Sequence, residues 1–173
     1  MRILMYMAFL ATAITNDFLQ LAEQDGRPLT QMQIQKLIYF SHGWSLALND
    51  QPLSIERFEA WDYGPVIRRL WERLRRYGSK PVTELVCDYA LVNGKFKTFH
   101  PTMETSKTVT SIGTSMDIVR TVWRKYGHFS AIELSELTHI PEGPWAAARK
   151  SGEPYIPDRS IKKYFSTLRK VAP

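Results

Sequence analysis

TQMQIQKLIYFSHGWSLALN, residues 30–49, is the stretch that decides the fold of this 173-residue chain. Thr30 followed three residues later by Gln33 is a capping box, in which each side chain accepts a hydrogen bond from the other residue's backbone amide. Leu29 and Ile34 are placed to close over this start as a hydrophobic staple. Apolar residues then follow helical spacing on one face and continue round the sides, so we expect a helix that is buried on most sides. Small residues would let neighbouring helices approach it closely, namely Ser41, Gly43 and Ser45.

The rest of the chain predicts further helices around this one. Helical spacing and stop signals indicate a first helix from about residue 7 to Glu23 and another near residues 115–126. Gly64 and Pro65 are expected to open the third helix, since proline suits the first helical position. Three later starts carry a second capping box or a proline, at Ser130, Pro144 and Asp158. The fold class is therefore mainly α: a compact helical domain around a central buried helix.

A small β-hairpin is expected to interrupt the helices. Asn93 and Gly94 stand between the β-favouring stretches DYALV and KFKTF, and this dipeptide favours a two-residue hairpin turn because both of its positions need positive φ. We expect a hairpin over residues 88–99 that lies against the helices, because an isolated hairpin is marginally stable in water. A Ser/Thr-rich loop follows over residues 103–115. Residues 1–173 are read as one domain, with a core over about 8–168 and a hairpin and loop insertion over about 85–114.

Composition limits the classes of protein. The net charge of +6 and the pI near 9.5 favour acidic partners, either nucleic acid or an acidic protein surface. The single Cys87 cannot form an internal disulfide, which fits a reducing cytosol. MRILMYMAFLATA imitates a signal peptide, but its apolar stripe continues through Phe18 and Leu21, so we favour an ordinary first helix. No segment has the roughly 18 uninterrupted apolar residues of a membrane span, and we expect a cytoplasmic protein without a membrane partner.

The sequence carries none of the usual catalytic signatures: no phosphate loop, no Rossmann glycine fingerprint, no nucleophile elbow and no HExxH. The four histidines lack metal-type spacing, so we expect no metal and no cofactor. His42, inside the central helix, is interpreted as a hydrogen-bonded structural residue, and His128 and His139 as helix-end caps. We therefore predict that the chain is not an enzyme; a hydrolase or transferase using His42 or His128 is the alternative from that class.

Four blocks in order carry a family resemblance: LTQMQIQKLIYFSHGWSLAL at 29–48, FEAWDYGPVIRRLW at 58–71, YGHFSAIELSELTH at 126–139 and PWAAAR at 144–149. With these blocks the chain resembles the Panacea antitoxin family, also described as SocA-like and as phage-associated GepA-like. The resemblance implies an antitoxin that binds and neutralises a toxin encoded beside it. It also implies that relatives pair with diverse toxins. One branch looks like a proteolytic adaptor that delivers its toxin to a protease such as a Clp-type complex.

The partner surface is predicted on the turn and the basic helix that follow Trp61. A turn can present Asp62 and Tyr63 outward; alternatively, Asp62 caps the helix begun at Pro65 and Tyr63 packs beneath it. Arginine and tyrosine are frequent in protein interfaces, and arginines at helical spacing can act together on one acidic patch. The predicted contact residues are Asp62, Tyr63, Arg69, Arg73 and Arg76.

A second hypothesis is a DNA-binding repressor of its own operon, suggested by the net charge and by five arginines between residues 68 and 76. It is less favoured, because the central helix is too apolar to be a recognition helix and Glu133 and Glu136 would face the phosphates of a duplex. Nucleic acid is therefore not the expected partner. A toxin protein is.

Overall fold

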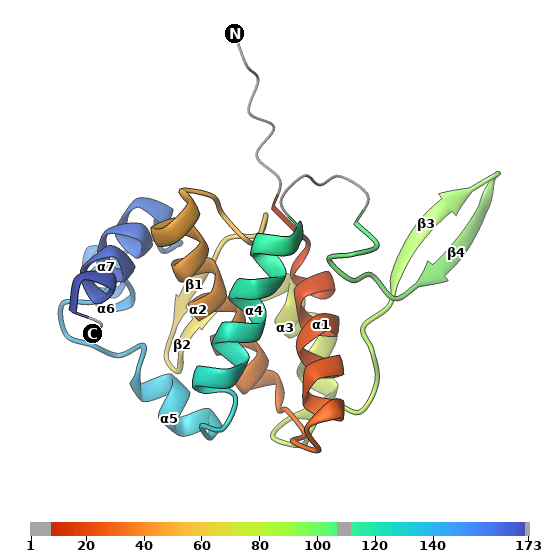
Figure 1. Cartoon of the computed structure of the whole chain (residues 1–173), viewed down its shortest axis with the longest axis horizontal. Coiled ribbons are helices and arrows are strands. Elements are labelled where there is room, and N and C mark those ends of the chain that lie inside the picture. Colours follow the sequence, from red (N-terminus) through yellow and green to blue (C-terminus); the bar gives the residue numbers. More distant parts are fainter. Residues whose placement is uncertain (1–7, 107–111, 172–173) are drawn as a thin grey trace, which may run out of the picture.

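The computed structural model describes residues 8–106 and 112–171. Its helices are α1 (Ala11–Gln24), α2 (Gln31–Asn49), α3 (Arg68–Leu74), η1 (Arg75–Tyr77, a 3-10 turn), α4 (Ile112–Tyr126), α5 (Ala131–Glu136), α6 (Pro144–Ser151) and α7 (Asp158–Val171). Two antiparallel hairpins pair β1 (Glu59–Trp61) with β2 (Gly64–Val66), and β3 (Asp88–Val92) with β4 (Lys95–Phe99). The predicted mainly α fold with a small β insertion is confirmed (Figure 1). The assignment of residues 1–173 to a single domain stays a prediction.

The central helix is α2, which packs against α1, α3, α4, α5 and α7. Its start has the predicted capping box: the Thr30 amide donates to Gln33 Oε1 at 2.9 Å, and the Gln33 amide donates to Thr30 Oγ1 at 3.4 Å. Side chains on several faces of residues 34–46 are buried. Because neighbours cover it on so many sides, α2 determines where the other elements lie.

The close approach of α7 to α2 depends on Gly43. A Cβ atom at this position would lie 2.3 Å from the ring of Phe165. Phe165 is completely buried and meets Tyr39 and Trp44 edge to face, at ring-centroid distances of 5.9 and 5.4 Å. The prediction that small residues of α2 admit a neighbouring helix is confirmed here.

The first helix starts later than predicted. Residues 8–10 are not helical, and α1 begins at Ala11, whose amide donates to Glu56 Oε2 at 2.9 Å. Phe9 instead forms a parallel bridge with Ser54, and its amide donates to the Leu53 carbonyl at 2.7 Å. The apolar stripe misled the prediction because Phe9 is buried equally well from an extended backbone. Residues 1–7, where the signal-peptide alternative begins, lie outside the described residues.

The prediction that Gly64 and Pro65 open the third helix is wrong. They belong to β2, where Ala60 pairs with Pro65 and Trp61 pairs with Gly64, and α3 begins only at Arg68. Proline fits β2 because a two-stranded sheet has open edges. A glycine and proline before a basic amphipathic stretch resemble a helix start, and three-residue strands are too short to show alternation.

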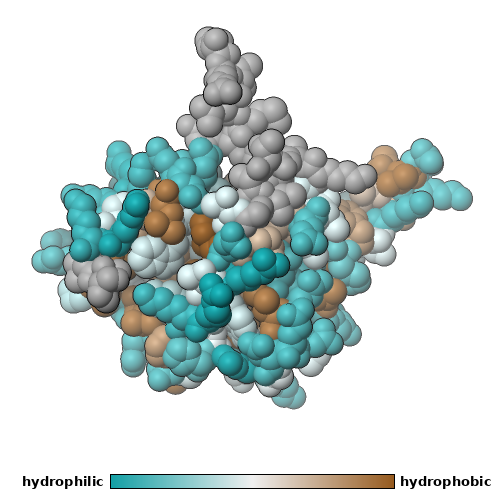
Figure 2. Space-filling view, viewed as in Figure 1, coloured by the Kyte–Doolittle hydropathy of each residue, from teal (hydrophilic) through white to brown (hydrophobic). Residues whose placement is uncertain are grey.

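The second hairpin has the predicted residues but not the predicted position. β3 and β4 pair from Asp88 with Phe99 to Val92 with Lys95, around the turn of Asn93 and Gly94. Contrary to expectation, the hairpin projects from the helical body, and apolar side chains lie on its exposed surface (Figures 1 and 2). Phe96 is 80% exposed. The prediction assumed that packing along its length would stabilise the hairpin, whereas the structure holds it at one end.

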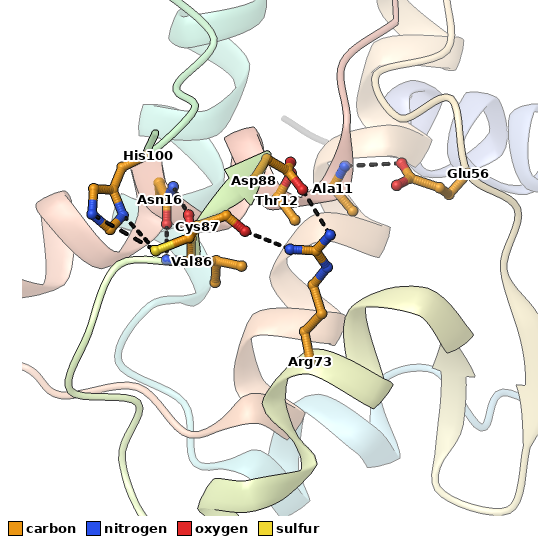
Figure 3. A network of polar contacts seen from close by, with 9 residues as sticks. All are labelled: Ala11, Thr12, Asn16, Glu56, Arg73, Val86, Cys87, Asp88 and His100. Carbon is orange, nitrogen blue, oxygen red and sulfur yellow. Dashed lines mark hydrogen bonds and ion pairs between the residues drawn. The ribbon is translucent and has the colours of Figure 1, made fainter. Parts of the chain in front are cut away.

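That end is a buried polar network (Figure 3). Asp88 accepts a hydrogen bond from Thr12 Oγ1 at 2.6 Å and forms an ion pair with Arg73 at 2.7 Å. Asn16 donates to the Val86 carbonyl at 2.9 Å and accepts from the Val86 amide at 2.7 Å. Side chains of α1 and α3 thus satisfy the backbone directly before β3 and the carboxylate of its first residue, which fixes the base of the hairpin.

The C-terminal helices follow the sequence predictions closely. α4 begins at Ile112, three residues before the predicted start near 115, while residues 107–111 of the predicted loop lie outside the described part of the chain. Ser130 and Glu133 form the second predicted capping box at the start of α5. α6 and α7 begin at Pro144 and Asp158, as predicted. Within the described residues, no helix combines the length and apolarity needed to cross a membrane.

Candidate partner-binding groove

The turn between β1 and β2 consists of Asp62 and Tyr63, and both point into solvent. Tyr63 is 72% exposed, and Asp62 is exposed as well. Of the two alternatives from the sequence, the outward turn is therefore the observed one, and Asp62 does not cap α3, which has no side-chain cap. The turn is held from behind: Ser135 Oγ donates to the Tyr63 carbonyl at 2.9 Å, and a ring nitrogen of His139 lies 3.0 Å from the Asp62 carbonyl. The aromatic side chain is thus presented on an ordered backbone.

Lys36 lies beneath this hairpin, inside the protein. Its side chain is completely buried, and its ammonium donates to the Pro65 carbonyl at 3.1 Å. Burial lowers the pKa of Lys36 from 10.5 to about 7, because the charged form loses its hydration. Gly64 allows the hairpin to pack this closely over Lys36: its φ is +99°, and a Cβ atom there would lie 2.4 Å from Thr138 Oγ1 and 2.9 Å from Lys36 Cε.

An apolar groove of about 880 Å³ opens beside the turn, between the N-terminal half of α2, the β1–β2 hairpin, α3 and α5. Its exposed wall includes Ile132, which is 67% exposed. The exposed area of the lining is mostly apolar, and the polar side chains along it are Thr30, Gln31, Gln35, Lys36, Asp62, Ser79 and Arg149. The apolar lining residues are Met32, Ala60, Trp61, Tyr63, Val66, Trp71, Ala131 and Ile132.

A second hollow of about 410 Å³ continues the groove past the turn toward the end of α5. The two hollows share Met32, Tyr63 and Ile132. Glu136 and His139 line the second hollow, and His139 Nδ1 lies 2.6 Å from the Ser135 carbonyl. His139 therefore lies against the last turn of α5, the helix that it follows, as predicted for a helix-end residue.

Cations border the groove on the side of α3 and α6. Arg149 pairs with Asp62 at 2.8 Å and also donates to the Ala60 carbonyl at 3.2 Å. Arg68 lies over the Trp61 ring, 5.1 Å from its centroid, and Arg75 lies 5.9 Å from the centroid of the Trp71 ring. Trp, Tyr and Arg are enriched among the residues that dominate interface energies, and a cation over an aromatic ring adds electrostatic attraction.

The fold places only some of the five predicted contact residues at the groove. Asp62 and Tyr63 line the groove, but none of Arg69, Arg73 and Arg76 is among the described residues that line it. Arg76 pairs with Glu84 at 2.7 Å, and Arg69 is exposed. Arg73 forms an ion pair with the buried carboxylate of Asp88 at 2.7 Å, because β3 starts beside α3. A role for these five residues in partner binding stays a prediction.

Two residues of the groove were not predicted from the sequence: Lys36 at its floor and Ile132 on its wall. Lys36 had a visible signal: it is a charged residue inside a helix predicted to be buried on most sides, between Ile34 and Leu37. Ile132 had none, because its exposure follows from how α5 crosses α2.

His42 lies in a hydrogen-bonded environment inside the protein. His42 is buried, accepts a hydrogen bond from the Ser54 amide at 3.2 Å through Nδ1, and lies 3.0 Å from Asp158 through Nε2. The predicted hydrogen bonding of His42 is thus observed, and it joins α2 to the start of α7. Across the described residues, no three His, Cys, Asp or Glu side chains are placed to hold a metal ion.

Comparison with known proteins places these elements in a family. The family model described as "Antitoxin SocA-like, Panacea domain" matches residues 34–146, a range that contains Lys36, the β1–β2 hairpin and α5. Antitoxin SocA of Caulobacter vibrioides (strain NA1000 / CB15N) is 28% identical to the chain over an alignment of 138 residues, which covers 78% of this chain and 68% of that protein. No solved structure gives a significant match.

Proposed function

The chain belongs to the SocA-like antitoxin family with the Panacea domain, and we propose that it neutralises a toxin protein by binding it directly through the groove beside Tyr63. The observation that carries the proposal is the exposed apolar pair of Tyr63 and Ile132 on either side of this groove. Contiguous exposed apolar surface typically marks an interaction site, and both of these side chains line one apolar groove. A toxin surface of matching shape would cover them.

The backbone of the turn favours tight binding. Ser135 Oγ donates to the Tyr63 carbonyl and His139 packs against the Asp62 carbonyl, so Tyr63 has few backbone conformations to lose when a partner binds. Pre-organised contact groups improve affinity by lowering the entropy cost of association. The arrangement supports recognition by shape, with Arg149 and the cations over Trp61 and Trp71 at the edge.

We propose that neutralisation is non-catalytic and takes place in the cytoplasm, where toxin and antitoxin are made together. Binding alone and delivery of the bound toxin to a Clp-type protease both begin with this contact. DNA binding is not favoured, because three of the five arginines between residues 68 and 76 already form ion pairs: Arg68 with Glu59, Arg73 with Asp88 and Arg76 with Glu84. These pairs leave fewer charges for phosphates than the sequence indicates.

The test is co-expression of this chain with the product of each neighbouring reading frame. We expect one product to arrest growth alone, to be tolerated together with this chain, and to co-purify with it. A mobility shift on the operon's promoter tests the DNA-binding alternative. Repeating the co-expression in a host without its Clp-type protease separates the two routes: protection that persists there indicates neutralisation by binding alone. Protection without any complex of the two proteins would contradict the proposal.

A further inference from the structure

Lys36 is a buried cation at an open groove. It is completely buried, yet it lines the groove beside Tyr63. Among the described residues, its one polar contact is the Pro65 carbonyl at 3.1 Å, and no carboxylate lies within ion-pair distance. An ammonium group has three N–H donors, and a single carbonyl satisfies one of them.

The surroundings of the Lys36 amine favour the binding of an anion beside it. Burial lowers the pKa of Lys36 to about 7, so the amine is divided between its neutral and charged forms at neutral pH. A carboxylate placed beside it would favour the charged form, because opposite charges attract strongly where water is excluded. Burying the charged amine without an anionic partner costs free energy. If this position served packing alone, an apolar side chain would avoid that cost.

The groove around Lys36 suits an extended apolar segment. Its two hollows share Met32, Tyr63 and Ile132, so a segment can run through the first hollow and on into the second. A segment from the interior of the toxin chain would run beyond both hollows and have no terminus there. The carboxylate that meets Lys36 would then belong to an Asp or Glu side chain. The other ionisable groups along this path are Asp62, Tyr63, Arg149, Glu136 and His139, and the Asp62 carboxylate is already paired with Arg149 at 2.8 Å.

We propose that the groove binds an apolar segment of the toxin whose Asp or Glu side chain reaches Lys36. The inference rests on the proposed function and deepens it, since it states which chemistry of the toxin is recognised. Apolar walls bind the body of the segment, and the buried amine selects its acid. Above pH 7, binding is accompanied by uptake of a proton by Lys36.

The chemistry of the groove can be tested without the toxin, using 4-phenylbutyrate as the probe and 4-phenylbutanamide as its uncharged match. In titration calorimetry at pH 7.5, the parent should bind the acid roughly tenfold more tightly than the amide, the effect of one hydrogen bond between charged groups. In Lys36→Met the preference should vanish. In Lys125→Met it should persist, because Lys125 lines a different hollow, between α2 and α4. Equal binding of acid and amide by the parent, or a preference that survives in Lys36→Met, would overturn the inference; the parent comparison stands even if that variant does not fold.

The toxin supplies the second arm. Lys36→Met should weaken toxin binding, one Asp→Asn or Glu→Gln variant of the toxin should weaken binding to the parent equally, and the two changes together should cost no more than either alone. If the parent protects cells and Lys36→Met binds and protects equally well, only this inference fails. If the parent itself does not protect cells from any neighbouring product, the proposed function fails.

Discussion

The guanidinium of Arg73 binds the carboxylate of Asp88 at 2.7 Å and joins α3 to the first residue of the projecting hairpin (Figure 3). Asp88 is buried, and Arg73 is only 26% exposed at its side chain. Arg73 also donates to the Cys87 carbonyl. Arg73, which is predicted to contact a partner, thus also joins two elements of the fold, so its replacement is expected to lower the stability of the fold.

Arg73→Met should lower the free energy of unfolding by about 2–3 kcal/mol, because it leaves the buried Asp88 carboxylate without its cation. Arg69→Met is the matched control, since Arg69 is an exposed residue of the same helix, and it should change stability by less than about 0.5 kcal/mol. Urea denaturation of the two variants measures both effects. Adding Asp88→Asn to Arg73→Met should recover part of the loss; equal midpoints for the parent and Arg73→Met would show that the pair contributes nothing.

Gly43→Ala should destabilise the chain by about 1–3 kcal/mol, because the new Cβ lies 2.3 Å from the ring of Phe165 and either α7 or the ring must move. The better helix propensity of alanine offsets at most about 1 kcal/mol. Thermal unfolding of Gly43→Ala, Phe165→Leu and the double variant forms a cycle. The double variant should lose less than the sum of the two single losses, since leucine vacates the space that the methyl group needs. Strict additivity would mean that the two residues do not compete.

Local signals explain which elements the sequence could predict. The capping boxes at Thr30 and Ser130 and the Asn-Gly turn act within a few residues, so their patterns are visible without the fold. The burial of Lys36 and the pairing of Arg73 depend on segments far along the chain. The β1–β2 hairpin could not be predicted because its short strands depend on contacts with α2. Gln35 of α2 binds Ile67, the residue after β2: it accepts from the Ile67 amide at 2.9 Å and donates to the Ile67 carbonyl at 3.2 Å.

Two buried groups should give the stability of this chain an unusual pH dependence. Burial raises the pKa of Asp17 from 3.8 to about 6, although its carboxylate accepts a hydrogen bond from the Met103 amide at 3.0 Å. Between these two values the folded state binds more protons than the unfolded state, so stability falls as pH rises from about 4 to 6. The loss is on the order of 3 kcal/mol.

Lys36 acts in the opposite direction at higher pH. Its pKa is lowered from 10.5 to about 7, so the unfolded state binds the extra proton between these values and stability rises with pH across that window. The two groups together predict a minimum of stability between about pH 6 and 7. Urea midpoints from pH 4 to 10 should show it, Asp17→Asn should flatten the acid side, and Lys36→Met the alkaline side. A curve that both variants leave unchanged would refute the prediction.

The last prediction compares two exposed apolar pairs of similar chemistry. Tyr63→Ala with Ile132→Ala removes the apolar walls of the groove, while Leu91→Ala with Phe96→Ala removes apolar side chains from the projecting hairpin. All four side chains are exposed, so each double variant should melt close to the parent.

Only the groove variant should lose the toxin. Truncation of central aromatic and aliphatic contacts typically costs about 1–2 kcal/mol each, so its Kd should rise by roughly one to three orders of magnitude, and protection of cells at equal expression should fail. The hairpin variant should bind and protect as the parent does. The opposite pattern would move the interface to the hairpin, because the groove pair would then be exposed without a partner and the rigid base at Asp88 would instead serve to present Leu91 and Phe96.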